Sequence, residues 1–153
     1  MKAIQDYYPE QFAHCYGCGR LNEQGLHLQT RWNGNQTLTT YLPDPRYTAV
    51  PGFVYGGLLA SIIDCHGTGS AALALAREKG LQPEGYNAPR CVTASLQVDY
   101  LLPTPMGVEL RVTGNIAEVK GRKVVVDAEL YAGDTLCVRG KIIAIEIPEH
   151  FGK

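Results

Sequence analysis

One long run of apolar and small residues constrains the fold of this chain more than any other segment. From about Leu58 to Lys79 no helix breaker other than glycine interrupts it, apolar residues recur at helical spacings, and Gly80 follows a polar end. The run is apolar nearly all round, which is typical of a buried helix. Its many glycines and alanines allow another element to approach the backbone closely. We therefore expect a central helix packed against something large.

Strand patterns lie on both sides of this helix in the sequence. An Asn33-Gly34 step before it indicates a hairpin, and segments after it alternate apolar and polar residues. In the first of these later segments, Val92, Leu96 and Tyr100 fall on the face that we expect to be buried. The expected strands are 26–32, 36–41, 92–100, 108–119, 123–131 and 135–147. The pattern favours an α+β fold, in which a curved antiparallel sheet of about six strands wraps around one long central helix.

Composition narrows the setting of the protein. The 153 residues suit one domain, which we place at 23–153 after an N-terminal lead-in at 1–22. A formal charge of −1 gives no basic surplus for nucleic acid, and neither a signal peptide nor a membrane span is expected. Five cysteines, an odd number, fit a reducing compartment, so we expect a cytoplasmic protein with no nucleic-acid or membrane partner.

Three polar residues interrupt the apolar helix. Ser61, Asp64 and Thr68 follow one another at steps of three and four, which places them on one stripe. A buried carboxylate is costly, so this stripe is the candidate active surface. His66 points to another side of the helix, and we expect it to be a packed or interface residue.

The residues before the stripe carry a family resemblance. Tyr55-Gly56-Gly57, followed by Leu58 to Asp64, resembles the His-Gly-Gly to Asp signature of hotdog-fold acyl-CoA thioesterases of the phenylacetate-pathway type. The lead-in from Cys15 to Leu26 is also similar to the segment before the first strand in many of these proteins. The resemblance covers about residues 14 to 147 and implies a hotdog fold. Tyr55 departs from it, because many relatives have histidine there.

The resemblance implies hydrolysis of an acyl-CoA thioester, with catalytic roles for four residues. Asp64 would be the general base or the nucleophile, and the backbone N–H of Gly56 would stabilise the oxyanion at the positive end of the helix dipole. Gly57 is the alternative oxyanion donor. Thr68 would orient the water or the carboxylate.

Substrate contacts are expected from three further residues. Tyr55 would cover the substrate channel or contact the acyl group, and Ser61 lies on the active stripe. Arg122, in the Lys120-Gly121-Arg122 turn, is a candidate for the phosphates of coenzyme A, although such a turn is ordinarily just solvated.

Helix geometry predicts the assembly. Gly57 and Asp64 are seven residues apart, hence about 10 Å along a helix, too far for both to act on one carbonyl. If both act on one thioester, two antiparallel helices must bring Gly56 of one subunit to Asp64 of the other. We expect a homodimer, or a dimer of dimers.

No metal and no cofactor is expected. Cys15-x-x-Cys18, with His14 and His27 nearby, has zinc-ligand spacing, but a second such pair is missing. Because Cys65, Cys91 and Cys137 fall in predicted helix and strand segments, a glycine-rich turn is the preferred interpretation.

Two other functions remain open. An acyl-thioester dehydratase or hydratase is less well supported. The pattern of that family is an aspartate and a histidine at longer spacing, which Asp64-Cys65-His66 does not resemble. A non-catalytic acyl-CoA-binding protein would keep the fold and the cleft, and the departure at Tyr55 keeps this possibility open.

Overall fold

A computed structural model of the protein describes residues 2–148 and 151. Two short 3₁₀ helices in the lead-in, η1 and η2, precede a single six-stranded sheet and one long α-helix, α1. Neighbouring strands are all antiparallel, in the order β1-β2-β4-β5-β6-β3. The elements are η1 Ile4–Tyr7, η2 Glu10–Phe12, β1 Arg31–Asn33, β2 Gln36–Tyr41, α1 Gly56–Glu78, β3 Cys91–Tyr100, β4 Leu110–Lys120, β5 Lys123–Ala132 and β6 Thr135–Glu146.

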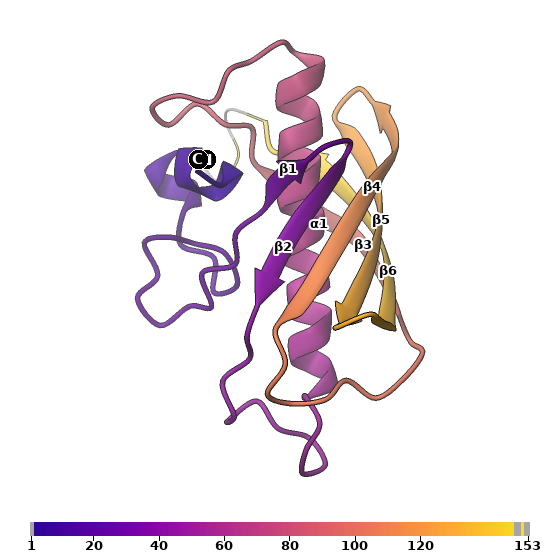
Figure 1. Ribbon diagram of the computed structural model, residues 1–153. Helices are drawn as coiled ribbons and strands as arrows, with labels where there is room; N and C mark the ends of the chain where they lie inside the picture. Colours follow the sequence, from indigo (N-terminus) through magenta and orange to yellow (C-terminus); the bar gives the residue numbers. More distant parts are fainter. Residues whose placement is uncertain (1, 149–150, 152–153) are drawn as a thin grey trace.

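The curved sheet wraps around α1, as expected from the sequence (Figure 1). Apolar side chains of α1, including Ile62 and Ile63, are buried against strands β3 to β6. Small residues set the spacing: a Cβ added at Gly67 would overlap Ile142, and one at Gly140 would overlap Ile63. The expected close packing of helix on sheet, and the α+β architecture, are therefore confirmed.

The helix begins two residues earlier than the periodicity predicts. Tyr55 has extended backbone angles, and its carbonyl accepts hydrogen bonds from the N–H groups of Leu58 and Leu59. Gly56 and Gly57 thus form the start of the first turn, despite the low helix propensity of glycine. At the other end Gly80, with φ of +63°, ends the helix in the left-handed conformation that glycine adopts readily.

The first predicted strand is wrong over most of its length. The expected strand at 26–32 is reduced to the three residues of β1. Upstream, Leu26 and Leu28 donate instead to the carbonyls of Tyr16 and Gly17 in the lead-in. His27 between them has φ of +56°, which an extended strand cannot contain.

The expected burial of one face of β3 is met only in part, because Val98 packs against the core cluster but most other apolar residues of the strand do not. Val92, Leu96 and Tyr100 are all exposed, with 39% of Leu96 and 53% of Tyr100 accessible. Because β3 is an edge strand of the sheet, part of its apolar surface has no cover within this chain.

The lead-in packs on the domain core. Ile4, Tyr8 and Cys18 belong to the same buried cluster as residues of α1. The helix itself is long and apolar enough to cross a membrane by length and composition, but 83% of its most apolar window is buried in the protein. Such burial is what a core helix of a globular domain requires.

Candidate active site

The carboxylate of Asp64 lies on the middle of α1 and faces the edge strand β3. Its side chain is only partly buried, and Thr93 of β3 donates a hydrogen bond from Oγ1 to Asp64 Oδ1 at 2.5 Å. This is the one hydrogen bond that the carboxylate receives within the described part of the chain. A carboxylate that is held on one side and open on the other can accept a proton or attack an electrophile.

Sequence analysis did not select Thr93, and a β-bulge explains why. Alternation places Thr93 on the polar, solvent-facing side of the strand, opposite to Val98 and Tyr100. The pairing of β3 with β6 shifts between Thr93 and Ser95, so Thr93 faces α1 like the alternate residues after the bulge. Bulges re-aim side chains in this way, but no residue pattern in the strand announces one.

The amino end of α1 presents two backbone donors. Among the described residues, the N–H groups of Gly56 and Gly57 have no hydrogen-bond acceptor, as expected for the first turn of a helix. Tyr100 of β3 donates from its hydroxyl to the carbonyl of Gly56 at 2.7 Å. Burial, and then the neighbouring Tyr55, raise the pKa of Tyr100, which keeps this donor protonated. The helix start is thus fixed while its amides stay open to an anion.

Tyr55 lies over the start of the helix. Its side chain is 55% exposed, and a Cβ on Gly57 would lie 2.6 Å from the Tyr55 ring atoms. Glycine at position 57 is therefore required for the tyrosine to take this place. The Tyr55 ring thus lies beside Gly57, and its expected role over the substrate channel stays a prediction.

An apolar cavity of about 490 Å³ adjoins Gly56. Its walls come from the loop before α1, the helix itself, and the segment that follows β3. Asp64 is not among the lining residues. The residues that line it are Ala49, Val50, Phe53, Val54, Gly56, Leu59, Tyr100, Leu101, Leu102, Pro103 and Thr104.

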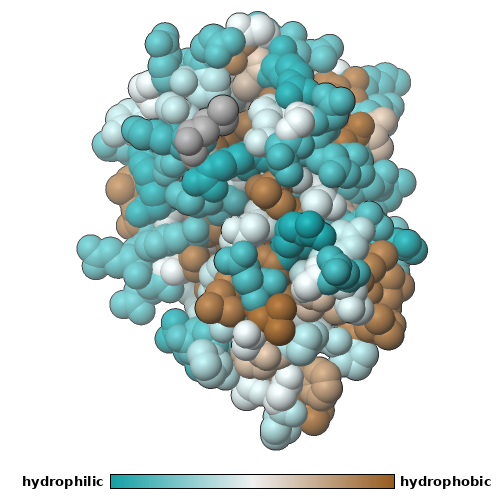
Figure 2. Space-filling model, in the orientation of Figure 1, coloured by the Kyte–Doolittle hydropathy of each residue, from teal (hydrophilic) through white to brown (hydrophobic). Residues whose placement is uncertain are grey.

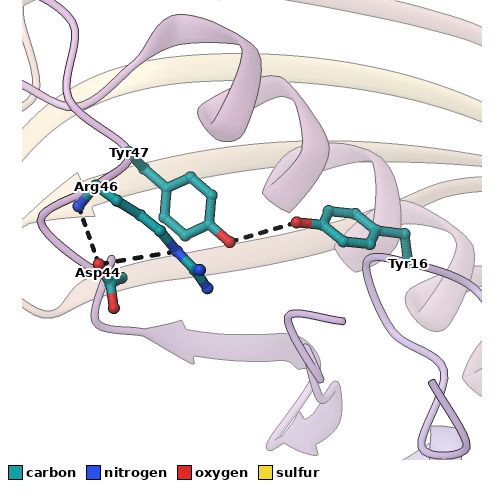
Figure 3. A network of polar contacts seen from close by, with 4 residues as sticks. All are labelled: Tyr16, Asp44, Arg46 and Tyr47. Carbon is teal, nitrogen blue, oxygen red and sulfur yellow. Dashed lines mark hydrogen bonds and ion pairs between the residues drawn. The ribbon is translucent and has the colours of Figure 1, made fainter. Parts of the chain in front are cut away.

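A cluster of tyrosines connects the lead-in to the loop that enters α1. The hydroxyls of Tyr16 and Tyr47 lie 3.4 Å apart, and Arg46 pairs with Asp44 beside them (Figure 3). The carbonyl of Tyr47 accepts the N–H of Tyr55 at 2.8 Å. Because exposed ion pairs contribute little, the backbone hydrogen bond is what positions Tyr55.

Other predicted site residues lie apart from the carboxylate or use their polar groups locally. Ser61 donates to the carbonyl of Gly57 at 2.9 Å, and the buried Thr68 donates to that of Cys65 at 3.2 Å. The carbonyl of Arg122 accepts the N–H of Glu146, whose carboxylate pairs with Lys79 at the carboxyl end of α1. The structure therefore does not bring Arg122 of one chain near Gly56 of the same chain (Figure 1).

His66 is a packed residue, as expected. It is fully buried, and its Nδ1 lies 2.8 Å from the hydroxyl of Thr39. Its Nε2 lies 3.4 Å from the hydroxyls of both Thr37 and Ser70. Burial lowers the pKa of His66 to about 3, so the ring is neutral.

Cys65 meets the Cys15-x-x-Cys18 turn, which the sequence analysis did not foresee. The three sulfur atoms all lie within 4.8 Å of one another. Cys65 lies in a helix, as predicted, and still reaches the turn, because the lead-in folds back onto α1. Hydrogen bonds from Cys18 and Cys65 hold the pKa of the Cys15 thiol far below its usual range. The hydrogen bond between Cys18 and Cys15 raises the pKa of Cys18 to about 12.

Comparison with known proteins identifies the family. The thioesterase superfamily model matches residues 51–141, which is more than half of the chain. The chain therefore belongs to the thioesterase superfamily. It is similar to a thioesterase superfamily protein of Shewanella loihica PV-4, with 48% identity, a TM-score of 0.69, and coverage of 90% of this chain and 97% of that one.

More distant similarities agree with the fold. A phenylacetic acid degradation-related protein of Ralstonia eutropha JMP134 is 18% identical, with a TM-score of 0.62 and coverage of 78% of this chain and 85% of that one. Acyl-coenzyme A thioesterase THEM4 of Xenopus laevis is 28% identical over 107 residues, or 70% of this chain. The chain spans 42% of the length of that relative. The hotdog fold expected from the sequence is thus confirmed.

Proposed function

We propose that the protein hydrolyses an acyl-CoA thioester to the free acid and coenzyme A. The single observation that carries the proposal is Asp64, a partly buried carboxylate on the central helix that accepts one hydrogen bond, from Thr93, among the described residues. In a thioesterase-superfamily chain this group can activate water or attack the carbonyl directly. Membership of the superfamily supports thioester hydrolysis in general, and the similarity to an acyl-CoA thioesterase supports the acyl-CoA substrate.

The oxyanion donor in this proposal comes from a partner subunit. The free amide of Gly56 and the carboxylate of Asp64 lie eight positions apart on one helix, which is about 12 Å. The cavity beside Gly56 does not include Asp64 of the same chain. A two-fold dimer with antiparallel α1 helices would place Gly56 of one subunit against Asp64 of the other, with Gly57 as the second donor.

The edge strand β3 supports this assembly. Hydrophobic side chains gather at the right edge of the face shown in Figure 2. The exposed apolar residues of β3 and of the segment that follows it include Leu96 and Leu102, the latter 50% accessible. Pairing of β3 with its copy would cover this edge and extend the sheet across the dimer. A dimer of dimers remains the alternative assembly.

Substrate contacts follow from the same arrangement. The apolar cavity beside Gly56 suits an acyl group. We keep Tyr55, next to Gly56 in the sequence, and Ser61, on the same helix, as proposed substrate contacts. Arg122 could meet the phosphates of coenzyme A only as part of a neighbouring subunit. We propose the cytoplasm as the compartment, because the five cysteines are free thiols.

The first experiment measures release of coenzyme A from short, medium, long-chain and aryl acyl-CoA esters. Turnover of at least one class by the wild type is expected. Retained acyl-CoA binding with no turnover on any ester would contradict the proposal and favour a binding protein, in which Tyr55 closes the site over Gly57.

The oxyanion role can be tested with a matched pair of variants at Gly56. Proline is tolerated at the first position of a helix and removes only the N–H, and the extended Tyr55 before it accepts a following proline. Gly56→Pro should lower kcat about 10²- to 10³-fold, whereas Gly56→Ala, which keeps the N–H, should stay near the wild type. Equal activity of the two variants would refute the role of this amide.

Mixed dimers test the shared site. Random pairing of Asp64→Ala with Gly56→Pro subunits should restore about a quarter of the wild-type rate, because half of the dimers contain one intact site. If each site lay within one chain, mixing would restore nothing. An active monomer in analytical ultracentrifugation would also refute the composite site.

A further inference from the structure

Three thiols, from two segments that are far apart in the sequence, meet where the lead-in packs against α1. Cys15 and Cys18 come from the turn of the lead-in, and Cys65 comes from α1. The sulfurs of Cys15 and Cys65 are 3.9 Å apart. Thiolates bound to tetrahedral zinc at about 2.3 Å lie about 3.8 Å from one another, whereas a disulfide needs about 2.05 Å. The distance between Cys15 and Cys65 therefore fits two ligands of one metal ion, and the other sulfur distances stay within 4.8 Å.

The turn is built to hold sulfur. Gly19 donates to the carbonyl of Cys15 at 2.7 Å, and the backbone amides of Cys18 and Gly17 contribute to the lowered pKa of the Cys15 thiol. Amide donors of this kind orient a ligating thiolate and stabilise its negative charge. A Cβ on Gly17 would overlap the Cys65 sulfur, so glycine at this position lets the turn close onto the helix.

The surroundings supply a matching charge. Arg90 lies close enough to Cys15, Cys18 and Cys65 for its positive charge to act on them. Its guanidinium donates hydrogen bonds to the carbonyls of Phe12 and Cys91. Three thiolates and a divalent cation carry a net charge of −1, which one arginine balances. A monovalent ion would leave a second negative charge uncompensated in this half-buried place.

A buried hydroxyl lacks a partner at the same place. The Tyr8 hydroxyl is fully buried and forms no hydrogen bond in the described structure. Burial raises its pKa, and Cys18 and Cys65 are near enough to contribute to the rise. The guanidinium of Arg90 lies 4.9 Å from the centroid of its ring. Buried polar groups normally have partners, and a water on a metal ion would give this hydroxyl one.

We propose that Cys15, Cys18 and Cys65 bind one divalent thiophilic cation, for which Zn²⁺ is the best fit, with a fourth position open to water. Such a site would join the lead-in to the turn of α1 that follows Asp64. It is independent of the proposed hydrolysis, because none of its ligands takes part in that reaction.

Cobalt substitution tests the site directly. Reduced, chelator-treated full-length protein would be titrated with Co²⁺ under argon, and thiolate-to-cobalt charge-transfer absorption recorded. Saturation at one Co²⁺ per chain is expected, followed by loss of the absorption when Zn²⁺ is added. Cys15→Ser, Cys18→Ser and Cys65→Ser should each lose or strongly weaken the absorption. Cys137→Ser is the matched control, since Cys137 is also a buried free cysteine but lies outside the cluster.

A stability measurement covers variants that fold poorly. Zn²⁺ should raise the Tm of the reduced wild type and of Cys137→Ser, because a ligand that binds the folded state stabilises it. Absence of both the absorption and the Tm shift in the reduced wild type would overturn the proposal. A disulfide formed in air by a protein that binds no Co²⁺ when reduced would overturn it as well, in favour of a redox pair.

Discussion

Asp64 and His66 stand two positions apart on the same helix, yet their surroundings are opposite. The imidazole of His66 is fully buried, and hydroxyls of Thr39, Thr37 and Ser70 lie within 3.4 Å of its two nitrogens. The carboxylate of Asp64 is partly exposed and has one donor. The two faces of α1 therefore differ in their hydrogen bonding. The polar groups of His66 on the interior face all have partners, whereas Asp64 on the face toward the edge strand keeps unused acceptor capacity.

This contrast bears on how a polar residue in a core helix is interpreted. A titratable side chain surrounded by partners mainly specifies packing, because every alternative arrangement leaves buried groups unsatisfied. A titratable side chain with free lone pairs is available to a substrate. Histidine would ordinarily attract attention first as a catalytic residue, but here the aspartate has the open position.

The largest expected effect comes from the open residue. Asp64→Asn should lower the rate of coenzyme A release about 10²- to 10⁴-fold, because the amide cannot act as base or nucleophile. Thermal unfolding should change little, since the amide can still accept from Thr93. Asp127→Asn, an exposed change on β5, serves as the control and should keep full activity. If Asp64→Asn were strongly destabilised, Asp64 would be a structural residue like His66, and the contrast between them would be contradicted.

The reverse result is expected for the saturated residue. His66→Leu should lower the free energy of unfolding by about 1–3 kcal/mol, because hydroxyls of the buried network lose their partner. The rate per folded molecule should stay within a few-fold of the wild type. Denaturant titration measures the first quantity and coenzyme A release the second. A large loss of kcat in a stable His66→Leu protein would place the histidine in the mechanism.

Acid should act through the same buried ring. The folded-state pKa of His66 is lowered by burial to about 3, below its unfolded value of about 6.5. The unfolded chain binds a proton in this window that the folded chain does not, so the stability contributed is full above pH 6.5 and is lost as the pH falls toward 3. The slope is about 1.4 kcal/mol per pH unit. Urea titrations at several pH values should show this slope in the free energy of unfolding. In His66→Leu the slope should be smaller by the contribution of one proton.

The smallest effect sharpens the role of the edge strand. Thr93→Val removes the hydroxyl that donates to Asp64 and should lower kcat by about tenfold or less, the value of one ordinary hydrogen bond. Thr93→Ser keeps the donor and should remain close to the wild type. If the two variants behave alike, Thr93 only packs against the helix.

Much of the fold was predictable because local patterns and burial agree. The apolar run predicted α1 within two residues at its start, and alternation located five of the six strands. The segment at 26–32 failed because its backbone pairs with the lead-in, a long-range choice that alternation does not encode. The exposed face of β3 was mispredicted for a related reason, since a pattern reports an apolar face but not which chain covers it.

The site was predictable only in part. Asp64, Gly56 and Gly57 were selected from the helix and the family signature, and their roles in the proposed reaction stay predictions. Thr93 could not be found, because a bulge reverses the face on which it lies. Cys65 was considered and set aside, because sequence separation hides the fold of the lead-in back onto the helix.

The glycine contacts between helix and sheet determine which genetic changes this fold accepts. Any missense change at Gly67 or Gly140 adds a side chain where Ile142 or Ile63 already fills the space. The helix would have to rise from the sheet, and Asp64 would move away from Thr93. In a saturation library these positions would therefore show a loss of activity like that expected at Asp64, although neither glycine belongs to the proposed site. At Gly67 and Gly140, even one added methyl group exceeds the space between helix and sheet, so the sequence can hardly vary there.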